Sequence, residues 1–132
     1  MPLNPGMGKK ILLVDDEKDW LFIPPLVLRE AGYEVFTAKD GTEALQVSDS
    51  ASLDLVILDV NLAGENGVEL MKFIRHNHPG VPIILYTGME HDDQAVRTML
   101  SQGAYRYLRK GSMEELLNVV KSATAGAPDK PA

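Results

Sequence analysis

Polar side chains follow several of the apolar runs in this chain. Asp15 and Asp16 come directly after the first run, and Asp59 comes directly after the third. Thr87 ends the fourth run, and Lys110 follows the fifth after one intervening residue. Taken alone, each is an ordinary loop residue. Together they comprise three carboxylates, a hydroxyl and an ammonium group, a set suited to holding a hard cation and a phosphate.

Three carboxylates in one small pocket need a counter-charge. At about 4 Å and an effective dielectric constant near 20, each pair costs around 4 kcal/mol. Lys110 supplies one positive charge, and a divalent cation would supply more. Magnesium prefers oxygen ligands and keeps several of its waters, which leaves room for a phosphate. The residue types therefore predict a Mg²⁺ site, provided that the fold brings them together.

Five short apolar runs are expected to form strands, and amphipathic stretches alternate with them. The first, third and fourth runs are nearly continuous in Ile, Leu and Val, as in strands buried on both faces of a parallel sheet. The second and fifth include polar residues, as edge strands do. The runs are Ile11–Val14, Glu34–Ala38, Leu53–Leu58, Val81–Tyr86 and Tyr105–Leu108.

Helical patterns lie between the runs. Asp40 is a predicted cap for a helix that continues through Gln46, and Ser112 with Glu115 forms a capping box before the last helix. Strand and helix alternate five times, which predicts an α/β fold whose ligand site lies beyond the carboxyl ends of the strands. The apolar faces of the later helices are formed by Val68, Leu70, Met71 and Ile74, by Val96, Met99 and Leu100, and by Met113, Leu116, Leu117 and Val120.

The first helical stretch, 19–31, contains Pro24 and Pro25. A proline inside a helix removes a hydrogen bond and clashes with the preceding turn, at about 3 kcal/mol or more. We therefore expect either a kink or a helix that restarts with Pro25 in its first turn.

Composition narrows the class of protein. The 132 residues suit one domain, and 45% of them are hydrophobic, enough for a core. The net charge of −6 argues against direct binding of nucleic acid by this domain. There is no cysteine, no hydrophobic signal core near the N-terminus and no apolar run long enough to span a membrane, so we expect a cytoplasmic protein without a membrane partner.

We expect residues 1–8 to be an N-terminal extension, 9–123 the folded domain, and 124–132 a flexible tail or the start of a linker.

Four segments carry a resemblance to a known family. They are Ile11–Glu17 (ILLVDDE), Asp54–Asn61 (DLVILDVN), Tyr86–Gly88 (YTG) and Gly103–Lys110 (GAYRYLRK). In this order, each at the end of a strand, they resemble the receiver domains of two-component response regulators, including the chemotaxis regulators. The resemblance covers residues 9–123. It implies a flavodoxin-like, doubly wound, five-stranded parallel sheet in the order 2-1-3-4-5 with five helices.

The resemblance also implies a role for each site residue. Asp59 would be the phosphoacceptor, whose carboxylate attacks the phosphorus of a phosphohistidine on a sensor histidine kinase or a phosphotransfer protein. Asp16, Asp59 and the backbone carbonyl of Asn61 would bind Mg²⁺, and Asp15 would hold it through water. Lys110 and the Thr87 hydroxyl would bind phosphoryl oxygens. Phosphoryl transfer depends mainly on positioning and charge neutralisation, which this set supplies.

Signal output is expected on the face formed by the fourth helix, fifth strand and fifth helix, about residues 91–124. By the resemblance, the Thr87 hydroxyl moves toward the phosphoryl group and the ring of Tyr107 turns inward. This face would bind a downstream protein or form a phosphorylation-dependent dimer. The domain would phosphorylate itself and lose the group slowly, so we do not expect an enzyme.

The sequence departs from the family pattern at the end of the fifth strand and after Asp59. Gly111 stands where the family usually has a proline joined by a cis bond; because a non-proline cis bond costs about 2.5–4 kcal/mol, we expect the Lys110–Gly111 bond to be trans. The loop after Asp59 has Ala63 in place of a common proline and Asn66 in place of Asp before Gly67.

Two other functions are compatible with these residues. The domain could be the receiver of a longer regulator that binds DNA or makes a second messenger, with the Ala-Pro-Gly tail as its linker. A more remote alternative is a phosphatase with an aspartyl nucleophile, of the haloacid-dehalogenase type; such enzymes carry a second acid two residues after the nucleophile, where this chain has Asn61.

His76 and His78 are expected at a solvated helix end, because residues two apart do not face one another on a helix.

Overall fold

Five parallel strands form the central sheet in a computed structural model that describes residues 8–62 and 64–125. The order across the sheet is β2-β1-β3-β6-β7, which confirms the predicted order of the five long strands. The edge strands are β2 and β7, the two whose sequences include polar residues. The strands are β1 (Lys10–Val14), β2 (Glu34–Ala38), β3 (Leu55–Leu58), β6 (Ile83–Thr87) and β7 (Arg106–Arg109).

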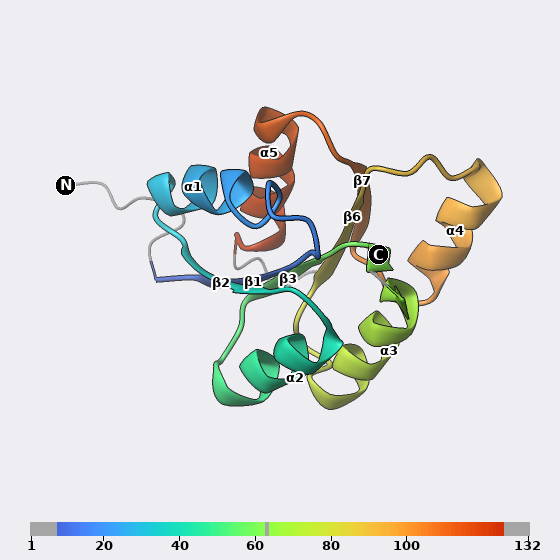
Figure 1. Cartoon of the computed structure of the whole chain (residues 1–132), viewed down its shortest axis with the longest axis horizontal. Helices are drawn as coiled ribbons and strands as arrows, with labels where there is room; N and C mark the ends of the chain where they lie inside the picture. The colour runs from blue at the N-terminus through green and yellow to red at the C-terminus, as the bar shows by residue number, and fades with distance from the viewer. Residues whose placement is uncertain (1–7, 63, 126–132) are drawn as a thin grey trace.

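Five helices in the described residues cover the two faces of this sheet. Helices α1 and α5 lie on one face, and α2, α3 and α4 lie on the other (Figure 1). The flavodoxin-like α/β architecture expected from the sequence is therefore confirmed. The helices are α1 (Ile23–Glu30), α2 (Gly41–Ser50), α3 (Gly67–Asn77), α4 (Asp93–Ser101) and α5 (Met113–Ala123).

Alternate residues of each central strand contribute to two separate hydrophobic cores. In β1, Leu12 and Val14 pack against α2 and α3, whereas Ile11 and Leu13 pack against α1 and α5. All four side chains are buried. This explains why the central strands are apolar at every position: a strand covered on both faces has no solvent-exposed side.

The two prolines occupy the first turn of α1, so the restart interpretation is correct. Residues 19–22 form a separate turn, in which the N–H of Ile23 donates to the carbonyl of Asp19 at 3.0 Å. Helix α1 then begins at Ile23, with Pro24 and Pro25 next. Prolines are tolerated there because the first N–H groups of a helix have no partner within the helix.

Side-chain caps set the beginning of the other helices. Asp40 accepts a hydrogen bond from the N–H of Glu43 at 2.9 Å, as predicted, although α2 continues past Gln46 to Ser50. Ser112 likewise accepts from the N–H of Glu115 at 3.0 Å. Each cap satisfies one of the unpaired N–H groups of the first turn.

A short antiparallel hairpin follows the third strand and was not expected from the sequence. It joins β4 (Asn61–Leu62) to β5 (Glu65–Asn66). The Asn66 side chain then caps α3 by accepting from the N–H of Val68 at 2.8 Å. Residue 63, one of the departures from the family pattern, lies outside the described residues.

The predicted terminal segments are described only in part. Residues 1–7 and 126–132 lie outside the described residues. Thr124, which was expected to begin the tail, is buried, and its hydroxyl lies 2.9 Å from the hydroxyl of Tyr33. The ordered packing of α5 therefore continues to Thr124.

Candidate functional site

Strand register places the predicted site residues along one edge of the sheet. Val14 lies opposite Leu58, so Asp15 and Asp59 leave adjacent strands at the same level. Thr87 lies opposite Arg109, so Lys110 comes one residue beyond this pair, and its N–H donates to the Thr87 carbonyl at 2.8 Å. Because all the strands are parallel, their carboxyl ends meet at this edge.

The ammonium group of Lys110 is the centre of the site. Its Nζ lies 2.7 Å from Oδ2 of Asp15, 3.1 Å from Oδ2 of Asp59 and 3.3 Å from Oε1 of Glu17. Asp15 and Asp59 are almost fully buried, whereas the side chain of Glu17 is 63% exposed. The counter-charge that the carboxylates require is therefore present, from the residue that the sequence indicated.

Burial and pairing shift the titration of this centre. Burial raises the pKa of Asp15, and its hydrogen bonds with Lys110 and with the N–H of Glu17 only partly oppose the rise. Burial alone would lower the pKa of Lys110, but its hydrogen bond with Asp15 and the charges of Asp15 and Asp59 outweigh it, so the pKa is raised. Lys110 therefore remains a cation at neutral pH.

Asp59 is oriented by the loop that follows β3. Its Oδ1 accepts a hydrogen bond from the N–H of Asn61 at 3.1 Å, and its Oδ2 faces Lys110. Gly67, at the start of α3, lies against the backbone carbonyls of Asp59 and Val60 so closely that a Cβ atom at this position would collide with them. This glycine is thus required by close approach of two backbone segments.

A divalent cation fits the donors at this edge. Carboxylate oxygens of Asp15, Glu17 and Asp59 all lie within 4.8 Å of one another. Hard oxygen donors at this spacing suit Mg²⁺. Asp16, a predicted ligand, is exposed and is not in this group of three, whereas Glu17, which was not predicted, is in it and lies beside Lys110. The signal for Glu17 was its position in the same acidic loop, two residues after Asp15.

The predicted switch residues Thr87 and Tyr107 are connected through Met89. The buried Thr87 hydroxyl accepts from the N–H of Met89 at 3.2 Å, and the Tyr107 hydroxyl donates to the Met89 carbonyl at 3.1 Å. The Tyr107 hydroxyl also lies 2.7 Å from Nδ1 of His91. Because its single proton goes to the carbonyl, Nδ1 of His91 must be the donor in that pair.

Sequence reasoning missed Met89 and His91 as neighbours of this site. Beyond the carbonyl contact, the Met89 sulfur accepts from the side-chain amide of Asn61 at 3.0 Å, so the loop after β6 lies beside the loop after β3. His91 lies in the loop before α4. Contacts between loops far apart in sequence leave no local pattern.

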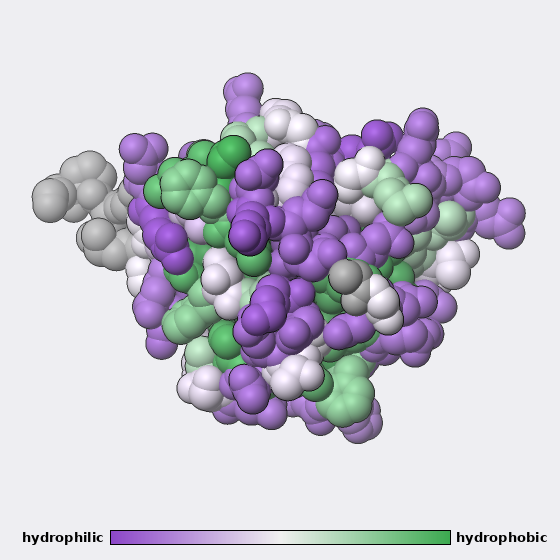
Figure 2. All heavy atoms as spheres, in the orientation of Figure 1, coloured by the Kyte–Doolittle hydropathy of each residue, from purple (hydrophilic) through white to green (hydrophobic). Residues whose placement is uncertain are grey.

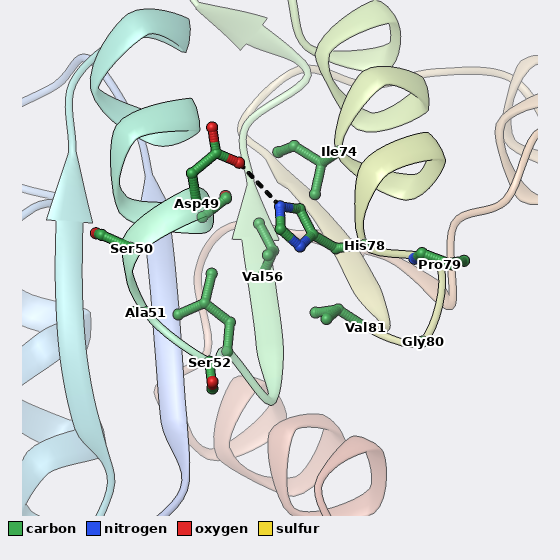
Figure 3. A pocket seen from close by; sticks show the side chains of 12 residues that line it. Asp49, Ser50, Ala51, Ser52, Val56, Ile74, His78, Pro79, Gly80 and Val81 are labelled. Carbon is green, nitrogen blue, oxygen red and sulfur yellow. Dashed lines mark hydrogen bonds and ion pairs between the residues drawn. The ribbon is translucent and has the colours of Figure 1, made fainter.

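A pocket of about 360 Å³ lies at the opposite edge of the sheet (Figure 3). It is lined by the carboxyl ends of α2 and α3, and across it Nε2 of His78 lies 3.1 Å from Oδ1 of Asp49. His76 is exposed in the last turn of α3, as expected for a solvated helix end. The phosphoacceptor candidate is at the other end of the strands, so this pocket is separate from the site.

Several large apolar side chains are exposed at the start of α1. Phe22, directly before α1, and Ile23 and Leu26 in its first turn are exposed, and Figure 2 shows hydrophobic surface over this helix. Within the residues that the structure describes, none of the helices is long and apolar enough to cross a membrane.

Comparison with known proteins agrees with this geometry. The family model of the response regulator receiver domain matches residues 11–121. The alkaline phosphatase synthesis transcriptional regulatory protein PhoP of Bacillus subtilis is 38% identical over 104 residues, which are 79% of this chain and 43% of that protein. The chain thus spans less than half the length of this curated relative.

Solved structures resemble the whole domain. A two-component response regulator from Clostridium difficile is 30% identical, with a TM-score of 0.83 over 92% of this chain and 99% of the other. The response regulator TrrA of Thermotoga maritima, solved in complex with Mg²⁺ and BeF, is 36% identical, with a TM-score of 0.78 over 87% and 98% of the two chains. The predicted site residues, from Asp15 to Lys110, lie within residues 11–121, which the family model matches.

Proposed function

Since this chain belongs to the response regulator receiver domain family, a family of signalling domains in two-component systems, we propose that Asp59 is its phosphoacceptor and Mg²⁺ its cofactor. The observation that carries the proposal is the buried carboxylate of Asp59, with Oδ2 3.1 Å from the Lys110 ammonium group. A carboxylate held beside a fixed cation is suited to accept a phosphoryl group, whose negative charge that cation then neutralises.

The transfer step uses the side chains of this chain in distinct roles. An oxygen of Asp59 attacks the phosphorus of a phosphohistidine; the P–N bond breaks as the new P–O bond forms, and the product is an acyl phosphate. Lys110 binds one phosphoryl oxygen, and the Thr87 hydroxyl binds another. When bound, Mg²⁺ neutralises charge on the phosphoryl oxygens. Asp15, Asp59 and Glu17 lie near enough to one another to hold it, and Asp16 and the Asn61 carbonyl are the further predicted ligands.

The partners follow from the family. A sensor histidine kinase or a phosphotransfer protein would supply the phosphoryl group, and a downstream protein would bind the face formed by α4, β7 and α5, residues 91–124.

The match to part of the Bacillus subtilis transcriptional regulator favours a second candidate, in which this receiver controls a longer regulator that binds DNA. The acidic domain itself would not contact DNA.

Intact mass spectrometry tests the proposal directly. With acetyl phosphate and Mg²⁺, the protein should gain the mass of one phosphoryl group, and with a chelator it should gain none. Asp59→Asn should abolish the gain. The matched control is Asp49→Asn, which changes a largely exposed carboxylate at the opposite edge of the sheet and should be labelled as the parent protein is. Undiminished labelling of Asp59→Asn would refute the assignment.

A further inference from the structure

Lys110 has a neighbour that its proposed role does not require. Its Nζ lies 4.9 Å from the centroid of the Trp20 ring and over that ring. Trp20 is half-buried in the turn before α1, ninety residues earlier in the chain. A cation over an indole face is attracted by the negative potential of the ring, most strongly when the pair is removed from water. The side chain of Lys110 is 5% exposed, so this condition is met.

Tyr86 holds the indole ring in place. Its ring meets Trp20 edge-on, with centroids 5.7 Å apart and an angle of 88° between the planes. This is a favourable arrangement for two aromatic rings. Tyr86 is fully buried in β6, a central strand, and so provides a rigid wall behind a residue that lies in a turn.

The hydroxyl of Tyr86 is a polar group inside the protein. Within the described residues it is the buried side-chain group that has no hydrogen-bond partner. Burial is the largest cause of the raised pKa of Tyr86, and the positive charge of Lys110 opposes the rise. Phenylalanine would fill the same space without leaving a hydroxyl unpaired, so packing alone does not explain the tyrosine.

The backbone after Lys110 does little to orient it. The Lys110–Gly111 bond is trans, as predicted, and Gly111 has a positive φ of 152°. No atom lies within 4 Å of the position that a Cβ atom at Gly111 would take. Glycine leaves this loop free to adopt other conformations, because it lacks the steric limits of other residues. The N–H bond to Thr87 holds the backbone of Lys110, so the position of its ammonium group depends on the contacts of its side chain.

We propose that Trp20 and Tyr86 form an aromatic support that positions Lys110 for phosphoryl transfer. The indole face attracts the same ammonium group that the carboxylates of Asp15 and Asp59 contact, and the ring of Tyr86 fixes the indole. Both act through Lys110, so they are positioning residues. The proposal rests on the proposed phosphoacceptor function of Asp59.

Fluorination of Trp20 tests the proposal with almost no change of shape. Trp20 is the single tryptophan of the chain, so biosynthetic labelling with mono-, di- and trifluorinated tryptophan changes this site alone. Fluorine withdraws electron density from the ring and weakens its attraction for a cation. The rate of Asp59 phosphorylation by phosphoramidate, at saturating Mg²⁺, should fall stepwise with each added fluorine. A flat series, with parent-like melting temperatures, would overturn the proposal.

Substitutions provide a second series. Trp20→Leu should slow phosphorylation about five- to thirtyfold, the range expected for loss of a desolvated cation–π contact. Trp20→Phe should restore part of the rate, and Phe22→Leu, which removes an exposed ring two residues away, should leave it unchanged. The Mg²⁺ affinity, measured by calorimetry, should stay at the parent value in all three. A parallel loss of Mg²⁺ affinity would mean that Trp20 acts only on the fold.

Two results separate this inference from the function on which it rests. Absence of any phosphorylation in the parent protein would refute the phosphoacceptor role of Asp59. Normal labelling of Asp59 in the parent, together with a parent-like rate in Trp20→Leu, would refute the positioning role of Trp20. It would leave the phosphoacceptor role of Asp59 intact. Tyr86→Leu, which removes the ring that meets Trp20 edge-on, should slow the rate about twofold to tenfold, the effect of losing one aromatic pair; a parent-like rate would remove Tyr86 from the proposal.

Discussion

Nζ of Lys110 lies 2.7 Å from Oδ2 of Asp15, and their side chains are only 5% and 2% exposed. This ion pair is buried together with the second contact of Lys110, to Asp59. Removing one partner of a buried ion pair leaves an uncompensated charge, at about 3–5 kcal/mol. The lysine should therefore stabilise the protein before any phosphoryl group arrives.

Lys110→Met is expected to lower the free energy of unfolding by about 3 kcal/mol in the absence of Mg²⁺. Added Mg²⁺ should recover part of the loss, because it replaces the missing positive charge. Urea denaturation with and without the metal measures both effects. Lys72→Met is the matched control: it removes an exposed pair with Glu69 and should cost about 0–1 kcal/mol. Equal losses in the two variants would contradict the role of burial.

Magnesium is expected to stabilise the parent protein by about 1.4 kcal/mol at a concentration ten times its dissociation constant. Asp16→Asn should remove most of this gain. The exposed Asp16 forms no ion pair within the described residues and can turn toward a cation, whereas Glu17 is already paired with Lys110. Glu17→Gln should therefore keep most of the gain. Thermal melts of both variants across a Mg²⁺ titration measure how much stabilisation each one keeps. If Glu17→Gln loses the gain and Asp16→Asn keeps it, Glu17 is the ligand.

Gly67→Ala should destabilise the protein and slow phosphorylation together. The added Cβ atom would collide with the backbone of Asp59 and Val60, so the loop that carries the phosphoacceptor must shift. Overpacking of this kind costs about 1–3 kcal/mol. Gly80→Ala is the control, because no atom lies within 4 Å of its added Cβ atom. A parent-like rate and stability for Gly67→Ala would contradict the close approach.

Alkaline pH should destabilise the protein through two tyrosines. Burial is the largest cause of the raised pKa of both Tyr86 and Tyr107, whose ordinary value is 10.0. A folded state that holds a proton more tightly than the unfolded chain is stabilised below that ordinary pKa, and the stabilisation is lost as the pH rises through the folded value. The urea concentration at the midpoint of unfolding should therefore decrease as the pH rises above about 10. The decrease should be less steep in Tyr86→Phe. Identical slopes in the parent and Tyr86→Phe would contradict this assignment.

Beryllofluoride with Mg²⁺, a mimic of the phosphoryl group, should shift NMR signals at the site and along α4, β7 and α5. The physical link is the loop after β6, in which Met89 bonds to Thr87 through its N–H and to Tyr107 through its carbonyl. Thr87→Ala should confine the shifts to the site. Thr98→Ala, which removes an exposed hydroxyl on α4, should preserve the parent response. Distal shifts that survive in Thr87→Ala would exclude the Thr87 hydroxyl as the link.

The sequence by itself determined the sheet and which side chains would meet at its edge. Continuous Ile, Leu and Val in the first, third and fourth runs indicated central strands, and polar residues in Glu34–Ala38 indicated an edge. Because parallel strands all end at one edge, the positions of Asp15, Asp59, Thr87 and Lys110 in the chain were enough to group them. Backbone geometry limited the stretch with the two prolines to a kink or a helix restart, and the structure shows the restart.

Only the tertiary structure decided which side chains face one another within that group. Local pattern does not distinguish Asp16 from Glu17, yet Glu17 contacts Lys110 and Asp16 does not join the carboxylate group. Trp20 meets Lys110 across ninety residues, and Met89 meets Asn61 across twenty-eight. Such contacts depend on the path of each loop and on side-chain packing, which are set by the completed fold and not by the alternation of apolar and polar residues.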